Sequence, residues 1–223
     1  MGISGSALAT PASLAHHHIL FLTKMGGPNF SVDQKISDHL IHEGFTVTIK
    51  NEDTAPSEAR QDDLVIISST VSGKNIDPQW RSARVNLLTW ENDILDDLAM
   101  SGKRHDVDFG EVPKERYLWI VNAPHPMSGG LKAGIANVYH QQAEMSWGKP
   151  GLGATLIATL YGQPEKVAIF GYEAGATMDY ETLAPARRVM LFMDNSTFTN
   201  LSEDGLTLFD AAIKWACAPS RSF

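Results

Sequence analysis

The feature that most constrains the fold is a series of short apolar runs that recur at regular distances along the chain. Continuous runs such as HILFLT and DLVIISST, bounded by polar residues and glycine, are typical of strands buried on both faces. The connections between most of them are long enough to hold a helix, which predicts βαβ units and a parallel sheet. We expect five strands in this series, at residues 18–23, 45–50, 63–70, 85–90 and 116–121.

Two of the connecting or closing segments carry clear helix signals. Residues 31–34 have capping-box spacing, and the apolar side chains of Val32, Ile36 and Leu40 fall on one helical face that ends before Gly44. At the end of the chain, Ser202 is a plausible N-cap for a helix with an inward apolar stripe. We expect further, shorter helices between residues 71 and 84 and over 91–100.

The pattern changes after Gly130. The runs at 153–160, 165–175 and 187–194 are split by glycine and proline, which favours an antiparallel or mixed extension of the sheet. With 223 residues and 43% hydrophobic content, one large core is favoured. We therefore predict a single α/β domain at residues 16–218, preceded by a flexible arm at 1–15 and followed by a tail at 219–223.

Charge and composition exclude several classes of partner. The formal charge is −8, with 18 Lys plus Arg against 26 Asp plus Glu, which argues against nucleic acid. No apolar run reaches the ~20 residues that a bilayer span needs. The single cysteine, Cys217, favours a cytoplasmic protein, and an exported origin stays an alternative. A polar arm is normally disordered unless something holds it, so we expect a homo-oligomer in which a neighbouring copy does so.

Candidate catalytic residues follow the fourth and fifth predicted strands. Open α/β sheets bind ligands beyond the carboxyl ends of their strands, so we expect Glu91 and His125 to share one cleft there. Glu91 could act as a general base, or it could simply cap a helix. His125 stands between two prolines that restrict its backbone, so it could exchange protons or be a structural histidine of a turn.

The same edge of the sheet offers candidate binding residues. The polar segment SSTVSG has hydroxyls suited to a sugar or a small anion, although an ordinary polar loop is the alternative. We expect Glu173 to pair near the cleft with one of two adjacent arginines, since only one of them can face inward, or to form a surface salt bridge. The predicted substrate-binding residues are Ser69, Thr70, Trp90, Asp93, Glu173 and Arg187.

We predict neither a metal nor another cofactor. His105, Asp106 and Asp108 are grouped in KRHDVDFG, but a second histidine at ligand spacing is missing, so a solvated loop is favoured.

The strand order, the segment HPMSGGL and the ending RRVMLFMDNSTF followed by a helix closing on AAIKWA together resemble the ThuA-like branch of the class I glutamine amidotransferase-like superfamily. The resemblance runs from about Ile19 to Ala216. It implies a flavodoxin-like three-layer sandwich and an association with sugar metabolism. The amidotransferases use a cysteine nucleophile after the fourth strand, where this chain has Glu91, so we predict that the protein is not a glutaminase.

Two functions remain open at this stage. One is a hydrolase or lyase acting on a carbohydrate-related small molecule, with Glu91 and His125 as acid and base. The other is a non-catalytic ligand-binding or assembly module that keeps the fold. The first requires the two side chains within hydrogen-bond reach, directly or through one water; the second predicts a filled or shallow crevice.

Overall fold

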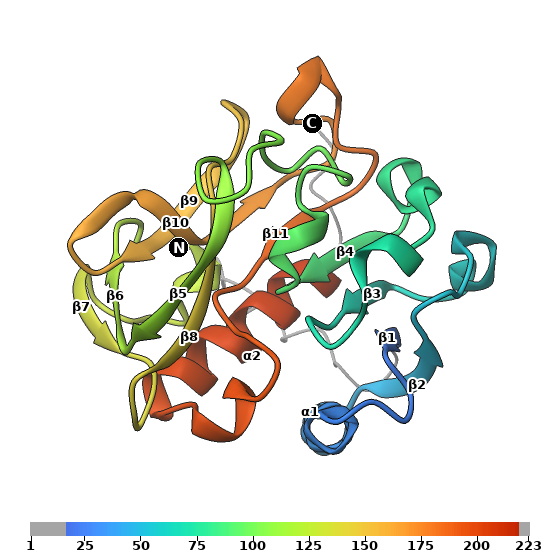
Figure 1. Cartoon of the computed structure of the whole chain (residues 1–223), viewed down its shortest axis with the longest axis horizontal. Helices are drawn as coiled ribbons and strands as arrows, with labels where there is room; N and C mark the ends of the chain where they lie inside the picture. The colour runs from blue at the N-terminus through green and yellow to red at the C-terminus, as the bar shows by residue number, and fades with distance from the viewer. Residues whose placement is uncertain (1–16, 219–223) are drawn as a thin grey trace, which may run out of the picture.

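The computed structural model describes residues 17–218, and the predicted arm at 1–15 and tail at 219–223 lie outside this range. Its core is one mixed sheet (Figure 1). One half is parallel: β2 (Thr46–Asn51), β1 (His18–Thr23), β3 (Leu64–Ile67), β4 (Asn86–Thr89) and β11 (Arg188–Met190) lie side by side in that order.

The other half of the sheet is antiparallel. It continues from β11 through β10 (Gln163–Tyr172), β9 (Thr155–Leu160) and β6 (Tyr117–Ile120) to β7 (Gly134–Asn137). A two-stranded ribbon, β5 (Phe109–Glu115) and β8 (Ala143–Gly148), joins this half through one pairing of β8 with β10. The predicted mixed extension is therefore confirmed, whereas the sheet as a whole is not mostly parallel.

The expected position of one strand is wrong. Residues 116–121 were predicted to continue the parallel series after β4, but β11 occupies the place beside β4. The strand β6 instead lies between β9 and β7 and is antiparallel to both. The chain thus leaves the parallel half after β4 and returns to it only with β11.

Both α-helices cover the same face of the sheet (Figure 1). Side chains of α1 (Phe30–His42) and α2 (Glu203–Cys217) pack on alternate strand residues such as Ile19 and Phe21. The intervening residues of the strand, Leu20 and Leu22, point to the opposite face of the sheet. Their side chains pack in a second core formed with loops and 3-10 helices. The α/β class is confirmed, but residues 17–218 place no α-helix on this second face, where a flavodoxin-like sandwich has its third layer.

Short 3-10 helices replace the helices expected after β3 and after β4. The connection from β3 to β4 holds η2 (Gly73–Asn75) and η3 (Pro78–Ser82), and η4 (Asn92–Ile94) follows β4. Residues 95–100 then form turns, with Ala99 at φ 58°, rather than the predicted helix over 91–100. The remaining 3-10 helices are η1 (Pro56–Ala59), η5 (Pro126–Ser128), η6 (Asp179–Glu181) and η7 (Thr197–Asn200).

The two α-helices differ in how well their starts were predicted. The hydroxyl of Ser202 accepts a hydrogen bond from the Gly205 backbone N–H at 3.1 Å, so Ser202 caps α2 as expected. In α1 the N-cap is Asn29, and Ser31 is the second helical residue. The capping box is therefore wrong, although Ile36 and Leu40 are buried and Gly44, at φ 100°, follows the helix as predicted. No helix within residues 17–218 is long and apolar enough to cross a membrane.

Candidate functional site

Glu91 lies at the carboxyl edge of the sheet, two residues beyond β4, and is only 6% exposed. Its Oε1 accepts a hydrogen bond of 2.9 Å from the Asp93 backbone N–H, so the side chain caps η4. Burial, with a smaller contribution from the negative charges of Asp93, Asp194 and Glu111, raises the pKa of Glu91 to about 8, although the hydrogen bond from the Asp93 backbone acts in the opposite direction. The side chain is therefore a neutral acid across most of the physiological range.

The ribbon of β5 and β8 lies over this end of β4 and β11. Asn92 donates from Nδ2 to Glu111 on β5 at 3.2 Å and to the Ser146 hydroxyl on β8 at 3.4 Å. The backbone N–H of Ser146 donates to the carbonyl of Phe192, just after β11, at 2.9 Å. These bonds fasten the ribbon across the place where ligands bind in open α/β sheets.

Other predicted binding residues at this edge are already engaged by the protein. The hydroxyls of Ser68 and Thr70 both donate to Asp33 on α1 at 2.7 Å. Burial raises the pKa of Asp33 to about 6, against the opposing effect of these two hydrogen bonds. Thr70 therefore ties β3 to α1, while Ser69 is nine-tenths buried and its hydroxyl has no partner within residues 17–218.

Trp90 is a core residue and not a binding residue. It is 1% exposed and packs between Phe21 and Phe209, with ring centroids 5.9 and 6.2 Å away. The prediction that it contacts substrate is wrong, because the strand alternation turns it under the helices. Asp93, by contrast, is exposed beside Glu91.

His125 lies in a different cluster. Its Nδ1, in the assigned tautomer, accepts a hydrogen bond from the Met127 backbone N–H at 3.2 Å, so the ring caps η5. The ring lies 5.3 Å from the Trp215 ring, and the Arg187 guanidinium stacks on that same indole at 4.4 Å. Arg187 in turn forms an ion pair with Glu173, with Nε to Oε2 at 2.7 Å.

The surroundings of His125 lower the pKa of its imidazole. Burial lowers the pKa of its imidazole, Glu173 acts in the opposite direction, and Arg187 lowers the pKa again. None of these influences comes from Glu91.

The structure places Glu91 and His125 at opposite edges of the sheet. The cluster around His125 includes Arg187, whose backbone N–H donates to Asn86 at the first residue of β4. Glu91 follows the last residue of that strand, which puts it about 16 Å further along. The two side chains do not share one cleft, so the predicted acid and base pair is wrong.

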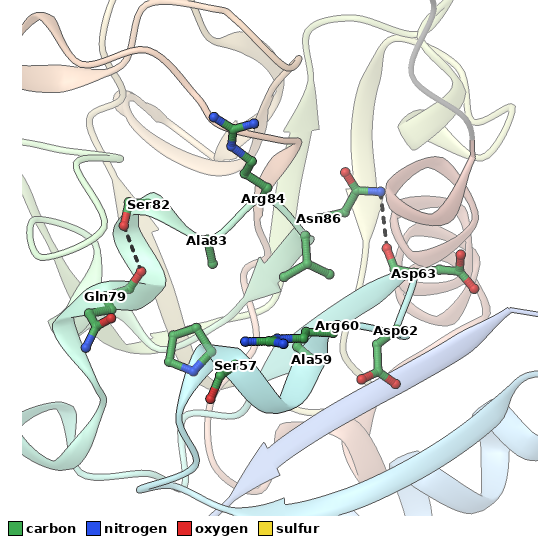
Figure 2. A pocket seen from close by; sticks show the side chains of 12 residues that line it. Ser57, Ala59, Arg60, Asp62, Asp63, Gln79, Ser82, Ala83, Arg84 and Asn86 are labelled. Atoms are coloured by element: carbon green, nitrogen blue, oxygen red, sulfur yellow. Dashed lines mark hydrogen bonds between the residues drawn. The ribbon is translucent and has the colours of Figure 1, made fainter.

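The amino edge carries a pocket of about 590 Å³ (Figure 2), which we call the amino-edge pocket. Its walls come from η1, from the residues before β3, and from the loop that runs from η3 to β4. The lining is mostly polar and includes Ser57, Arg60, Asp62, Asp63, Gln79 and Arg84. We did not predict these residues, because only the carboxyl ends of the strands were considered.

Several polar side chains of the pocket are available to a ligand. In the part of the chain that the structure describes, the side chains of Arg60, Arg84, Gln79 and Ser57 have no hydrogen-bond or ion-pair partner, whereas Asp63 accepts from the His18 backbone N–H at 2.9 Å. Figure 2 shows Arg60 and Arg84 on different walls of the pocket. The arrangement offers both donors and acceptors at the amino ends of β3 and β4.

The histidine and aspartates of residues 105–108 form a solvated loop. His105 contacts Asp106 at 3.2 Å, and Asp108 is paired with Arg104 at 2.9 Å. Across residues 17–218 no group of three or more His, Cys, Asp or Glu side chains is arranged to hold a metal ion.

No family model and no curated protein matches this sequence. Solved structures do match its shape. A protein described as ThuA-like from Bacteroides uniformis superposes with a TM-score of 0.59 at 10% identity, covering 97% of each chain. A protein described as one of the subunits of GMP synthase, from Thermoplasma acidophilum, gives 0.53 at 14% identity, covering 91% of this chain and 94% of the other.

The N-terminal domain of mmIFT52 is a third match, with a TM-score of 0.55 at 9% identity, covering 92% of this chain and all of that domain. At such low identity the likeness concerns the fold alone. The expected resemblance is confirmed at that level: the chain has the ThuA-like, class I glutamine amidotransferase-like fold.

Proposed function

We propose that the protein is a non-catalytic ligand-binding module that keeps the amidotransferase-like fold, and that its ligand occupies the amino-edge pocket. The observation that carries this proposal is the separation of Glu91 and His125. A hydrolase or lyase using them as acid and base requires hydrogen-bond reach, or one bridging water. Their positions at opposite edges remove that mechanism.

The state of the carboxyl edge supports the same proposal. Glu91 caps η4, lies under the β5 and β8 ribbon and is 6% exposed. A buried, protonated carboxyl group with no access to a substrate is a structural group. The β5 and β8 ribbon, bonded to Asn92 and to the carbonyl of Phe192, lies across the edge where ligands bind in open α/β folds.

The chemistry of the amino-edge pocket indicates the ligand class. Arginine and amide donors stand beside carboxylate acceptors, as in Arg84, Gln79 and Asp62. Neighbouring hydroxyls of a sugar are both donors and acceptors, so they suit such a mixed lining. A volume of about 590 Å³ accommodates a small molecule of this kind. We therefore propose a small, polyhydroxylated, carbohydrate-related ligand.

Binding and turnover can be tested together. We expect saturation-transfer NMR to detect glucose or maltose on the wild-type protein and on Ser196→Trp, an exposed site remote from the pocket. Ser82→Trp, which places an indole in the pocket, is expected to abolish the signal. Glutamine and nitrophenyl glycosides are expected to show no turnover that depends on Glu91 or His125.

Two results would contradict the proposal. Glycoside or glutamine turnover that is lost in Glu91→Gln or His125→Ala would show an enzyme. Ligand binding that survives Ser82→Trp would place the binding site elsewhere.

A second candidate function, assembly, is favoured by one exposed surface. On β6, on β7 and directly after β9, the side chains of Trp119, Ile135 and Tyr161 are 44%, 57% and 46% exposed. Trp119 is paired with Ile135 across the strands, and its ring lies 6.3 Å from that of Tyr161. Exposed apolar patches of this kind mark interaction sites.

We propose that a second copy of this chain covers this surface. Within residues 17–218, β7 is the end strand of the sheet (Figure 1), and the Asn137 carbonyl on it accepts a hydrogen bond from the Ser202 hydroxyl. Packing of this face against the same face of a second copy buries the apolar side chains. By light scattering we expect a dimer that Ile135→Lys dissociates and Leu183→Lys, at a 62% exposed apolar control site, does not. A wild-type monomer would refute this candidate.

A further inference from the structure

A second pocket, of about 400 Å³, adjoins the amino-edge pocket. One of its walls belongs to η3 and the other to the segment that follows η6, and each wall carries a proline, Pro78 and Pro185. Leu183, on the second wall, is 62% exposed. We call this second pocket the proline pocket. Its lining is mostly apolar, so it differs in chemistry from the polar amino-edge pocket.

The two pockets meet at η3. Gln79 and Ser82 line both of them, whereas Pro78 and Arg81 line only the proline pocket. In a 3-10 helix, residues three positions apart lie on the same face, so each of these pairs forms one row along η3. Gln79 and Ser82 are exposed, and Figure 2 shows them at one side of the amino-edge pocket. Their row is therefore an open rim, which one ligand can cross from the first pocket into the second.

The walls of the proline pocket are fixed to each other. Arg81 donates from Nη2 to the Thr182 hydroxyl at 3.0 Å, which joins η3 to the opposite wall. The same guanidinium lies 5.5 Å from the centre of the Tyr180 ring. Leu183 pairs with Thr177 in a β-bridge, so the backbone sets its position. The pocket is preformed, and little ordering of the protein opposes binding there.

The apolar wall of this pocket is left open to solvent. Among the large apolar side chains of residues 17–218, only Leu152 is more exposed than Leu183. An apolar group placed against Leu183 and the two prolines is stabilised by its removal from water, by about 25 cal/mol for each Å² buried. A pocket of about 400 Å³ accommodates a group of the size of a phenyl ring.

We propose that the ligand of the amino-edge pocket is a glycoside, and that its apolar aglycone crosses the rim of η3 into the proline pocket. This inference rests on the proposed function and names the second half of its ligand. The sugar contacts the polar lining, and the aglycone contacts Pro78, Leu183 and Pro185. The shared rim of Gln79 and Ser82 is the reason to assign both pockets to one small molecule.

Calorimetric titration of the full chain with four probes tests the proposal: glucose, methyl β-glucoside, phenyl β-glucoside and cellobiose. We expect phenyl glucoside to bind about tenfold more tightly than methyl glucoside, because only its ring reaches the apolar wall. Its heat-capacity change of binding is expected to be more negative, as apolar burial requires. Cellobiose, which extends glucose by a polar ring, is expected to show no such gain.

Variants connect the preference to the named residues. Leu183→Ser is expected to lower the affinity for phenyl glucoside to that for methyl glucoside and to leave glucose binding unchanged. Leu152→Ser, the same change at an exposed leucine that lines neither pocket, is the control and is expected to alter neither affinity. Ser82→Trp places an indole on the shared rim and is expected to abolish binding of both glucosides.

The outcomes separate this inference from the proposed function. Equal affinities for the two glucosides would overturn the aglycone site and leave the sugar-binding module intact. The inference also fails if cellobiose matches phenyl glucoside, or if the preference survives Leu183→Ser. Dissociation of a dimer by Leu183→Lys in light scattering would assign the proline pocket to a second copy instead. If none of the four probes binds, both the inference and the proposed function fail.

Discussion

At the scale of single residues, Glu91 shows how burial changes the role of an acid. Its carboxyl group lies two residues beyond β4, is 6% exposed, and is protonated at neutral pH because burial raises its pKa to about 8. The free energy of folding must therefore depend on pH through this group. Above about pH 4.5 the unfolded chain releases a proton that the folded chain keeps up to about pH 8. Stability consequently falls as the pH rises through this window.

Glu91→Gln removes this dependence, because glutamine resembles the protonated carboxyl group and its Oε1 can still accept from the Asp93 backbone. We expect the variant to be more stable than the wild type at pH 8, by on the order of 2–4 kcal/mol, and nearly equal to it at pH 4. Urea unfolding at several pH values measures this difference. Glu165→Gln, at an exposed position of β10, is the control and is expected to keep the wild-type slope. Parallel curves for Glu91→Gln and the wild type would mean that Glu91 is ionised in the folded protein.

At the scale of elements, the turn at η6 holds two residues in an unfavourable backbone conformation. Tyr180 and Glu181 have φ values of 54° and 53°, and the Thr182 N–H donates to the Asp179 carbonyl at 3.1 Å. Such a turn normally carries Asn and Gly. The Tyr180 ring lies near Arg81 and Lys103, at 5.5 and 5.1 Å, and these cation contacts help to hold it.

Glu181→Gly is expected to stabilise the protein by about 1 kcal/mol, because relief of the strained φ exceeds the entropy that glycine adds to the unfolded chain. Thermal unfolding should show a higher Tm. The control Thr182→Gly, at a position with φ −86°, is expected to lower the Tm instead. A decrease for both variants would show that the positive φ at Glu181 carries no strain.

The elements also show what a sequence can and cannot predict. β1, β3 and β4 were found because continuous apolar runs match strands buried on both faces. The run at 116–121 looks the same, yet Trp119 and Val121 face solvent and only Leu118 and Ile120 are buried. Because the exposed positions are apolar too, the sequence does not show the alternation of apolar and polar residues that is typical of an antiparallel strand. The strand was therefore predicted to lie in the parallel series, and not between β9 and β7.

The candidate site was predicted less well than the fold, for a related reason. Glu91 and His125 were each placed correctly after a strand. Two strand ends lie at the same edge of a sheet only if the strands run in the same direction, and the local sequence pattern does not indicate strand direction. The burial of Glu91 comes from β5 and β8, which were not predicted as strands. The proline pocket, likewise, joins η3 to a segment about one hundred residues later in the chain.

At the scale of the whole molecule, the parallel half gives the sheet two chemically different edges. The carboxyl edge is crossed by the β5 and β8 ribbon, and the Glu91 carboxyl group is buried there. The amino edge holds an open polar pocket and, nearby, the cluster in which His125 and Arg187 both contact Trp215. The pocket thus lies at the edge opposite to the one where open α/β sheets bind ligands.

This separation predicts independent energetics for the two residues first expected to act together. In a double-mutant cycle measured by urea unfolding at pH 7, Glu91→Gln and His125→Ala are expected to be additive within about 0.5 kcal/mol, because residues more than ~10 Å apart without shared partners do not couple. The pair His125→Ala and Trp215→Leu, whose rings lie 5.3 Å apart, is the positive control and is expected to couple more strongly. A coupling above about 1 kcal/mol between Glu91 and His125 would require them to be close neighbours. It would restore the acid and base pair, and with it the enzyme.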